Sequence, residues 1–219
     1  MRAHEARALT PERGRKGVRR IAAGIDQNQL SADMAELVNL ALSLGADDAG
    51  ELTREGILFD EAADGGADAV NLFVSAHWPL NYPNDSLKDA LRAFSRAVFF
   101  RVKTPKDMPD YGHGPIMDRA HLPFYEKVSE IAAKVEAAAF YMGHHLTLGF
   151  GAGNCRAIYC AKQKRCMAAV RGRVCVNPYK ARPSMIAAGL NPEGMADALK
   201  WPHWNDETGP LLAGIVFIA

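Results

Sequence analysis

Apolar residues recur at helical spacing in several parts of the chain. The clearest helix is predicted at residues 123–143, where apolar side chains return every three or four positions and Pro123 suits the first turn. A second helix is predicted at 32–44, with Ser31 or Asp33 as its N-cap and Gly45 at its end. Further helices are expected at 86–96, at one turn from Ser184 to Gly189, and from Asn191 to Lys200.

Short apolar runs rich in β-branched and aromatic residues separate these helices and predict strands. Because helices alternate with strands, we expect an α/β or α+β fold with a mixed sheet and flanking helices. Residues 26–219 are expected to form a single domain. The predicted strands lie at 49–52, 57–59, 69–75, 97–102, 146–148 and 211–218.

The N-terminal segment has a different composition from the rest of the chain. Residues 1–20 contain seven Arg or Lys and two Glu, and residues 1–25 therefore read as a basic arm, solvated or docked on a partner subunit. The apolar stretch after Arg19-Arg20 ends at Asp26 and is too short for a signal peptide. With no apolar run near the ~20 residues that span a bilayer, the sequence indicates a cytoplasmic protein without a membrane anchor.

All four cysteines fall within residues 155–175, in the pattern C-x4-C-x5-C-x8-C formed by Cys155, Cys160, Cys166 and Cys175. Four thiolates are a complete ligand set for an iron–sulfur cluster or a zinc ion. Structural zinc sites usually use two C-x2–4-C pairs, whereas here only Cys155 and Cys160 fall within that spacing and the chain has no C-x2-C. Disulfides require an oxidising compartment. An iron–sulfur cluster is therefore favoured, while zinc and disulfides or free thiols remain open.

Positive charge is concentrated around these cysteines. Residues 153–192 contain eight Arg or Lys and no Asp or Glu. Basic neighbours lower thiol pKa values and stabilise an anionic cluster, so the charge fits a metal centre. The glycines at 149, 151 and 153 are expected to let backbone N–H groups approach cluster sulfur. Contact with nucleic acid is disfavoured, because few aromatic residues are interleaved with the basic ones.

The segment from Gly153-Asn-Cys-Arg-Ala-Ile-Tyr-Cys160 to Ala181-Arg-Pro-Ser-Met185 resembles a family of predicted metal-binding proteins of anaerobic bacteria and archaea. The resemblance is most specific over residues 151–190 and implies an iron–sulfur cluster, [4Fe–4S], in anaerobic metabolism. The chain departs from the family at Ala76-His-Trp-Pro-Leu-Asn-Tyr-Pro83, which lacks the cysteine of a Cys-Pro-Pro segment. Ile186 also replaces a glutamate.

Three functions follow as hypotheses, with residues 149–190 as the metal-binding segment in each. The first is electron transfer, or a redox accessory role beside a partner enzyme, with a redox partner protein as the expected partner and a homo-oligomer left open. The second is an oxidoreductase, or a subunit of one, in which the cluster adjoins a substrate pocket and His77 is the catalytic candidate. The third is a zinc-stapled module that binds an anionic partner.

Overall fold

The computed structural model describes residues 26–60, 84–106, 108, 119–163, 166, 174–202 and 212–219. The predicted basic arm, the predicted strand at 69–75 and His77 lie outside these residues. Helices and strands occur in the order α1 Gln27–Ser43, β1 Asp48–Thr53, η1 Arg54–Gly56, α3 Asn84–Arg92, β2 Arg96–Val102, η2 Arg119–His121, α4 Leu122–Tyr141, β3 Leu148–Phe150, α5 Cys155–Tyr159, α7 Pro192–Ala198 and β4 Leu212–Phe217.

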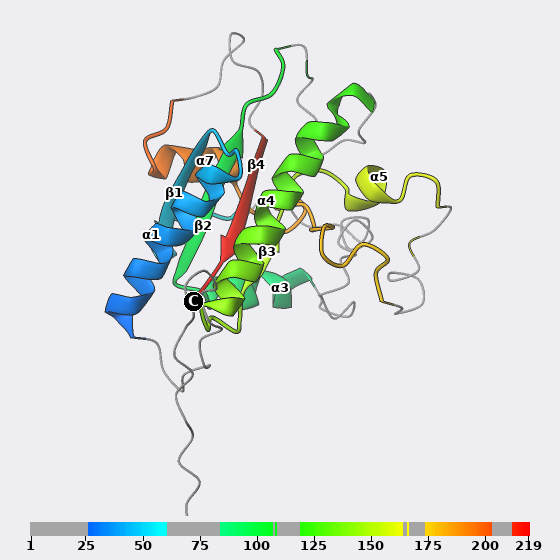
Figure 1. The fold of residues 1–219 in the computed structure, drawn as a ribbon. Coiled ribbons are helices and arrows are strands. Elements are labelled where there is room, and N and C mark those ends of the chain that lie inside the picture. Colours follow the sequence, from blue (N-terminus) through cyan, green and yellow to red (C-terminus); the bar gives the residue numbers. More distant parts are fainter. Residues whose placement is uncertain are drawn as a thin grey trace, which may run out of the picture.

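The described strands form one sheet in the order β1-β2-β4-β3, with every neighbouring pair antiparallel. Helices α1 and α4 lie side by side across one face of this sheet (Figure 1). The predicted combination of helices and a sheet is confirmed. The expected mixture of strand directions is limited, among the described residues, to an isolated parallel bridge between Gly151 and Ser184 beside β3.

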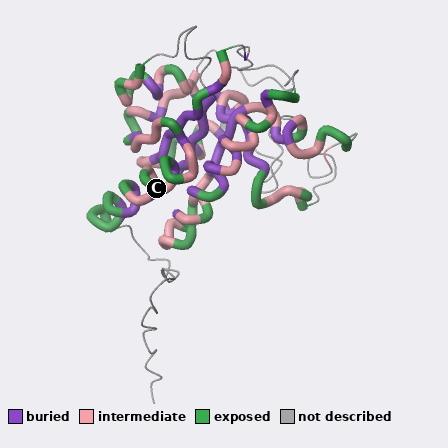
Figure 2. The backbone as a smooth tube through the Cα atoms, turned by 45° about the horizontal axis from the view of Figure 1, so that its top comes forward, coloured by how far each residue is buried: buried purple, intermediate pink, exposed green. Residues whose placement is uncertain are grey.

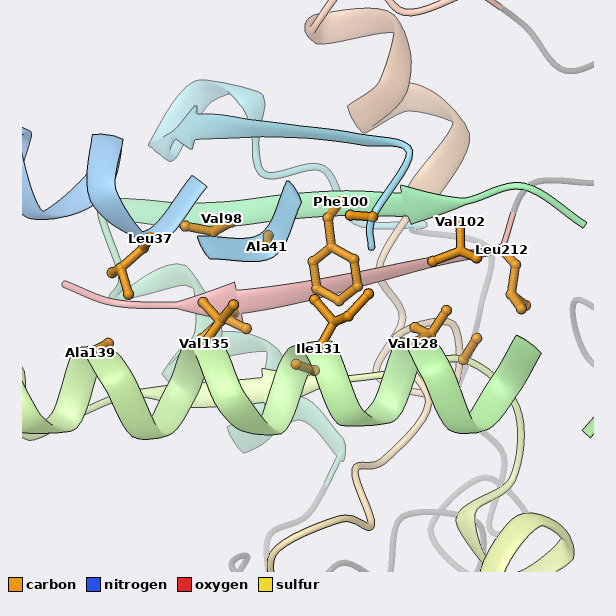
Figure 3. Close-up of a cluster of buried hydrophobic side chains, with 14 of the residues drawn as sticks. Leu37, Ala41, Val98, Phe100, Val102, Val128, Ile131, Val135, Ala139 and Leu212 are labelled. Atoms are coloured by element: carbon orange, nitrogen blue, oxygen red, sulfur yellow. The ribbon is translucent and has the colours of Figure 1, made fainter. Parts of the chain in front are cut away.

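Alternate residues of the two central strands face opposite sides of the sheet and belong to two separate cores. Val98, Phe100 and Val102 of β2 pack with α1 and α4, and Figure 3 shows their side chains between the sheet and these helices. Ala97 and Phe99 face the other way, toward residues of α3 and α7. Strand β4 alternates in the same manner, so both central strands are buried on both faces. Figure 2 shows the buried segments, in purple, gathered in the middle of the domain.

The first helix begins earlier than the sequence pattern indicates. Its N-cap is Asp26, whose carboxylate accepts hydrogen bonds from the backbone N–H groups of Asn28 and Gln29. The predicted cap Asp33 instead lies inside the helix and is buried, with its Oδ2 3.0 Å from His144 Nε2 just beyond α4. The helix ends as predicted, because Gly45 follows with a φ of 97°.

Two short strands differ from their predicted positions. Residues 57–59 follow the turn η1 and contribute only an isolated bridge between Phe59 and Leu190. The strand predicted at 146–148 is β3, displaced to Leu148–Phe150. The helix predicted at 86–96 is α3, which ends at Arg92 because β2 begins at Arg96. The long helix is confirmed as α4 and Asn191 caps α7, whereas residues 184–189 form a hydrogen-bonded turn in place of a helix. Among the described residues, the structure contains no helix long and apolar enough to cross a membrane.

We predict that Gly214→Ala destabilises the domain by about 1–3 kcal/mol, the usual cost of overpacking a filled core. A Cβ at Gly214 would lie 2.5 Å from Phe100 Cζ and 3.0 Å from the backbone oxygen of Phe150. Urea unfolding followed by circular dichroism measures the loss. Gly56→Ala is the control, since its Cβ would meet only the Leu52 side chain. A Gly214 variant as stable as the parent protein would contradict this account of the core.

Candidate metal centre

The four cysteines lie on one long loop whose two ends are joined. We call residues 152–183 the cysteine loop. At its base, the Gly151 N–H donates to Pro183 O at 2.8 Å, and the Met185 N–H donates to Gly151 O at 2.9 Å. These two bonds form the parallel bridge between Gly151 and Ser184, so the loop leaves the sheet edge and returns to the same place.

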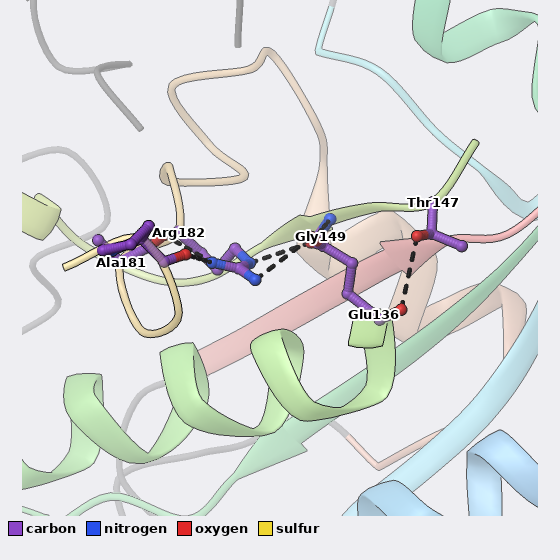
Figure 4. Close-up of polar contacts among 6 residues, drawn as sticks. Glu136, Thr147, Gly149, Ala181 and Arg182 are labelled. Carbon is purple, nitrogen blue, oxygen red and sulfur yellow. Dashed lines mark hydrogen bonds and ion pairs between the residues drawn. The ribbon is translucent and has the colours of Figure 1, made fainter. Parts of the chain in front are cut away.

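A buried ion pair anchors the returning end of the loop to α4. The Arg182 guanidinium contacts both carboxylate oxygens of Glu136, with Nε to Oε2 at 3.0 Å and Nη2 to Oε1 at 3.3 Å. Its Nη1 also donates to Pro178 O and Ala181 O. Glu136 in turn accepts a bond from the Gly149 N–H at 2.6 Å, so one carboxylate holds both the end of the loop and the strand that leads into it (Figure 4).

Gly149 of β3 and Gly151, just after this strand, are required by packing. A Cβ at Gly149 would lie 2.5 Å from Glu136 Oε2, and a Cβ at Gly151 would lie 2.9 Å from Ser129 Oγ. Both contacts are with α4, which therefore lies directly against this edge of the sheet. The sequence analysis assigned these glycines to a cofactor. In the structure they admit the helix and its anchoring carboxylate.

Helix α5 places the first two cysteines. Asn154 caps the helix by accepting a bond from the Arg156 N–H at 2.9 Å, and Cys155 is the first helical residue. Ile158 is buried in the core shared with α4, and the Tyr159 hydroxyl donates to Glu126 O at 3.5 Å. Cys160 ends the helix. Cys155 is therefore buried against the body of the domain, whereas Cys160 is half-buried.

Asn177 connects cysteines that are far apart in the sequence. Its side-chain Nδ2 donates to Cys160 Sγ at 3.3 Å, and its backbone N–H donates to Cys175 Sγ at 3.4 Å. The same residue starts a turn, since its carbonyl accepts the Ala181 N–H at 2.9 Å. Sequence analysis missed Asn177, although an asparagine two residues after a ligand cysteine is a donor well placed for sulfur.

Burial and electrostatic repulsion between the thiols affect their pKa values. Burial, and then repulsion from Cys175, Cys166 and Cys160, raises the pKa of the Cys155 thiol to about 12. Burial likewise raises the pKa of Cys160, although the Asn177 hydrogen bond and the Arg156 charge oppose the rise. The Arg156 charge lowers the pKa of Cys160, as expected of a basic neighbour, but burial outweighs it and the net pKa of both thiols is raised.

The chemistry of the donor set fits a metal ion or cluster. All four cysteines are free thiols, so the structure does not support the disulfide alternative. Within the described part of the chain, however, no three His, Cys, Asp or Glu side chains are grouped closely enough to hold a metal. Repulsion of Cys155 by the other three indicates that the thiols share one neighbourhood without forming a closed ligand shell.

The comparison with protein families agrees with this donor set. The family model described as "Predicted metal-binding protein (DUF2284)" matches residues 75–218. The matched region contains all four cysteines, Asn177, and both partners of the ion pair between Arg182 and Glu136. No curated protein and no solved structure matches the chain.

We predict that Arg182→Met lowers the free energy of unfolding by about 3 kcal/mol, because it leaves the largely sheltered Glu136 carboxylate without its cation. Lys180→Met is the matched control. Lys180 lies 3.9 Å from Glu130 and both side chains are exposed, so its loss should cost less than about 1 kcal/mol. Urea unfolding of the metal-free proteins measures both changes. Equal effects would show that Arg182 does not anchor the loop.

Proposed function

This chain belongs to the DUF2284 family of predicted metal-binding proteins, and from that premise we propose that it binds one iron–sulfur cluster, [4Fe–4S], and transfers electrons. The observation that carries the proposal is the position of Asn177 between two thiols from opposite ends of the cysteine loop. Two N–H groups aimed at sulfur are the contacts that stabilise thiolate ligands. The proposed ligands are Cys155, Cys160, Cys166 and Cys175.

The spacing of the ligands favours a cluster over zinc. Zinc knuckles place two sulfurs in one tight turn, whereas here Cys155 and Cys160 occupy the two ends of α5. A cluster has four iron corners and accepts sulfurs from more widely separated positions. When bound, it would take up and release single electrons.

The chain itself supplies the surroundings that such a cluster needs. Cys155 is buried at the start of α5, whose Ile158 packs in the core shared with α4, so one ligand is fixed by the body of the domain. Asn177 donates toward two sulfurs, and the Arg156 charge acts on Cys160. Hydrogen bonds and positive charge near sulfur favour the reduced, more negative state. Cys160, Cys166 and Cys175 are each half-buried, which brings this side of the centre toward the surface.

Protein prepared anaerobically is expected to be brown and to contain about four iron and four acid-labile sulfide per chain, with an EPR signal after reduction. Replacing each cysteine in turn by serine should remove most of the iron. Met185→Leu is the control, because it removes a sulfur at the base of the loop without removing a thiol. A colourless protein with one equivalent of zinc would overturn the cluster in favour of a zinc module.

Asn177→Ala is expected to weaken metal binding by about 10–100-fold, the usual effect of losing a contact to a metal ligand. The cluster's midpoint potential should also fall, because the Cys160 sulfur loses its side-chain donor. Competition with a chelator and a redox titration measure the two effects. Asn191→Ala is the control, since the Asn191 side chain caps α7 by accepting a bond from the Gly194 N–H. An unchanged affinity and potential would remove Asn177 from the site.

A further inference from the structure

We propose that the exposed rim of the cysteine loop, formed by Val174, Val176 and Tyr179, is the docking surface for a small acidic electron-carrier protein. The inference rests on the proposed electron-transfer function and names the partner class for that centre. The evidence for it is the exposure of these side chains, their closeness to the cysteines along the chain, and the charge around them.

The three side chains are among the most exposed large apolar groups of the described residues. The exposed fractions are 81% for Val174, 65% for Val176 and 87% for Tyr179. Single exposed apolar residues are common on protein surfaces, whereas a group of them beside a site marks an interaction surface. These three fall within six consecutive positions.

The rim borders the proposed centre directly. Val174 and Val176 are the two neighbours of Cys175, whose sulfur accepts the Asn177 N–H. Asn177 also reaches Cys160, so the rim and the end of α5 surround the same sulfurs. A protein seated on the rim would therefore approach the cluster from the side where three ligands are half-buried.

The surrounding charge selects an acidic partner. Arg156, Lys162 and Lys180 are exposed, although Lys180 lies 3.9 Å from Glu130 of α4. Residues 153–192 contain eight basic residues and no acidic one, and of the eight Arg182 is paired with Glu136 inside the domain. Two copies of the chain would bring like charges together at this surface, which disfavours self-association. Nucleic acid is disfavoured as well, because two of the three rim side chains are valines, which neither stack on bases nor form hydrogen bonds.

The reaction at this surface is a one-electron exchange. The reduced carrier loses one electron and returns to its oxidised form, and the cluster bound by this chain gains that electron. No bond is formed or broken. A docking surface with a small apolar centre and a charged surround suits such an exchange, because it gives fast association and fast release.

The test uses an acidic plant-type [2Fe–2S] ferredoxin in its oxidised form as the probe. It is titrated into the iron-loaded protein in a calorimeter at low salt and again at high salt. We expect salt-sensitive binding that weakens at least tenfold in the triple variant Val174→Ser/Val176→Ser/Tyr179→Ser. The iron and sulfide contents of the variant should equal those of the parent protein.

A second exposed apolar group provides the matched control. Phe140, Tyr141 and Leu146 are 49%, 57% and 64% exposed, at and beyond the far end of α4. Tyr141 lies eleven residues along the helix from Glu130, the residue that Lys180 contacts, which is about 16 Å of helix. The triple variant Phe140→Ser/Tyr141→Ser/Leu146→Ser should bind ferredoxin as tightly as the parent protein.

Each other result overturns the docking surface. The first is that the iron-loaded parent protein binds ferredoxin no more tightly than the rim variant does. The second is that the control variant loses as much affinity for ferredoxin as the rim variant. Another is a dimer, seen by sedimentation, that only the rim substitutions dissociate, which would assign the rim to a second copy. A single-stranded RNA whose binding needs the rim would assign it to nucleic acid. Protein without iron and sulfide overturns the proposed function, and the docking surface with it.

Discussion

The contact between Arg182 and Glu136 is the interaction on which the candidate centre depends. It joins the end of the cysteine loop to the long helix of the domain, and Glu136 also holds the Gly149 N–H of the strand that leads into the loop. With one side chain 6% exposed and the other 18%, the pair is sheltered from water. Such a pair fixes geometry more than it adds stability, because desolvation offsets much of the attraction. Its role here is therefore to set where the loop begins and ends.

This anchor is possible only because the sheet edge beside it is built from small residues. Glycines at 149 and 151 allow α4 to lie against β3, and any side chain there would displace Glu136 or Ser129. Gly214 serves the adjacent strand in the same way, since the Phe100 ring lies over it. The close packing of α4, the absence of side chains at the three glycines and the position of the Glu136 carboxylate therefore depend on one another. A change in any of them would move the base of the loop.

The sequence was informative wherever a single element is governed by its own side chains. Strands β2 and β4 and helix α4 were predicted within about two residues, because each buries a long, regular apolar pattern. The predicted start of α1 was wrong because Asp33 resembles an N-cap in the sequence. In the structure its carboxylate contacts His144, which lies 111 positions away. The cysteines were found from their clustering. Asn177 and Glu136 were not, because their side-chain partners, Cys160 and Arg182, lie 17 and 46 positions away. The one local signal was the position of Asn177 two residues after Cys175.

The bridge between Gly151 and Ser184 also determines what metal binding must accomplish. Closing a flexible loop of about 33 residues costs about 3 kcal/mol of chain entropy, and the cost grows only slowly with length. The packing of the domain core and the contacts of Arg182 offset this entropy before any metal is bound. If the four cysteines lay on an otherwise free chain, the metal–ligand bonds themselves would have to offset it. In this chain the binding energy is left to bring the thiols together and to release their protons, which the high pKa of Cys155 makes a substantial step.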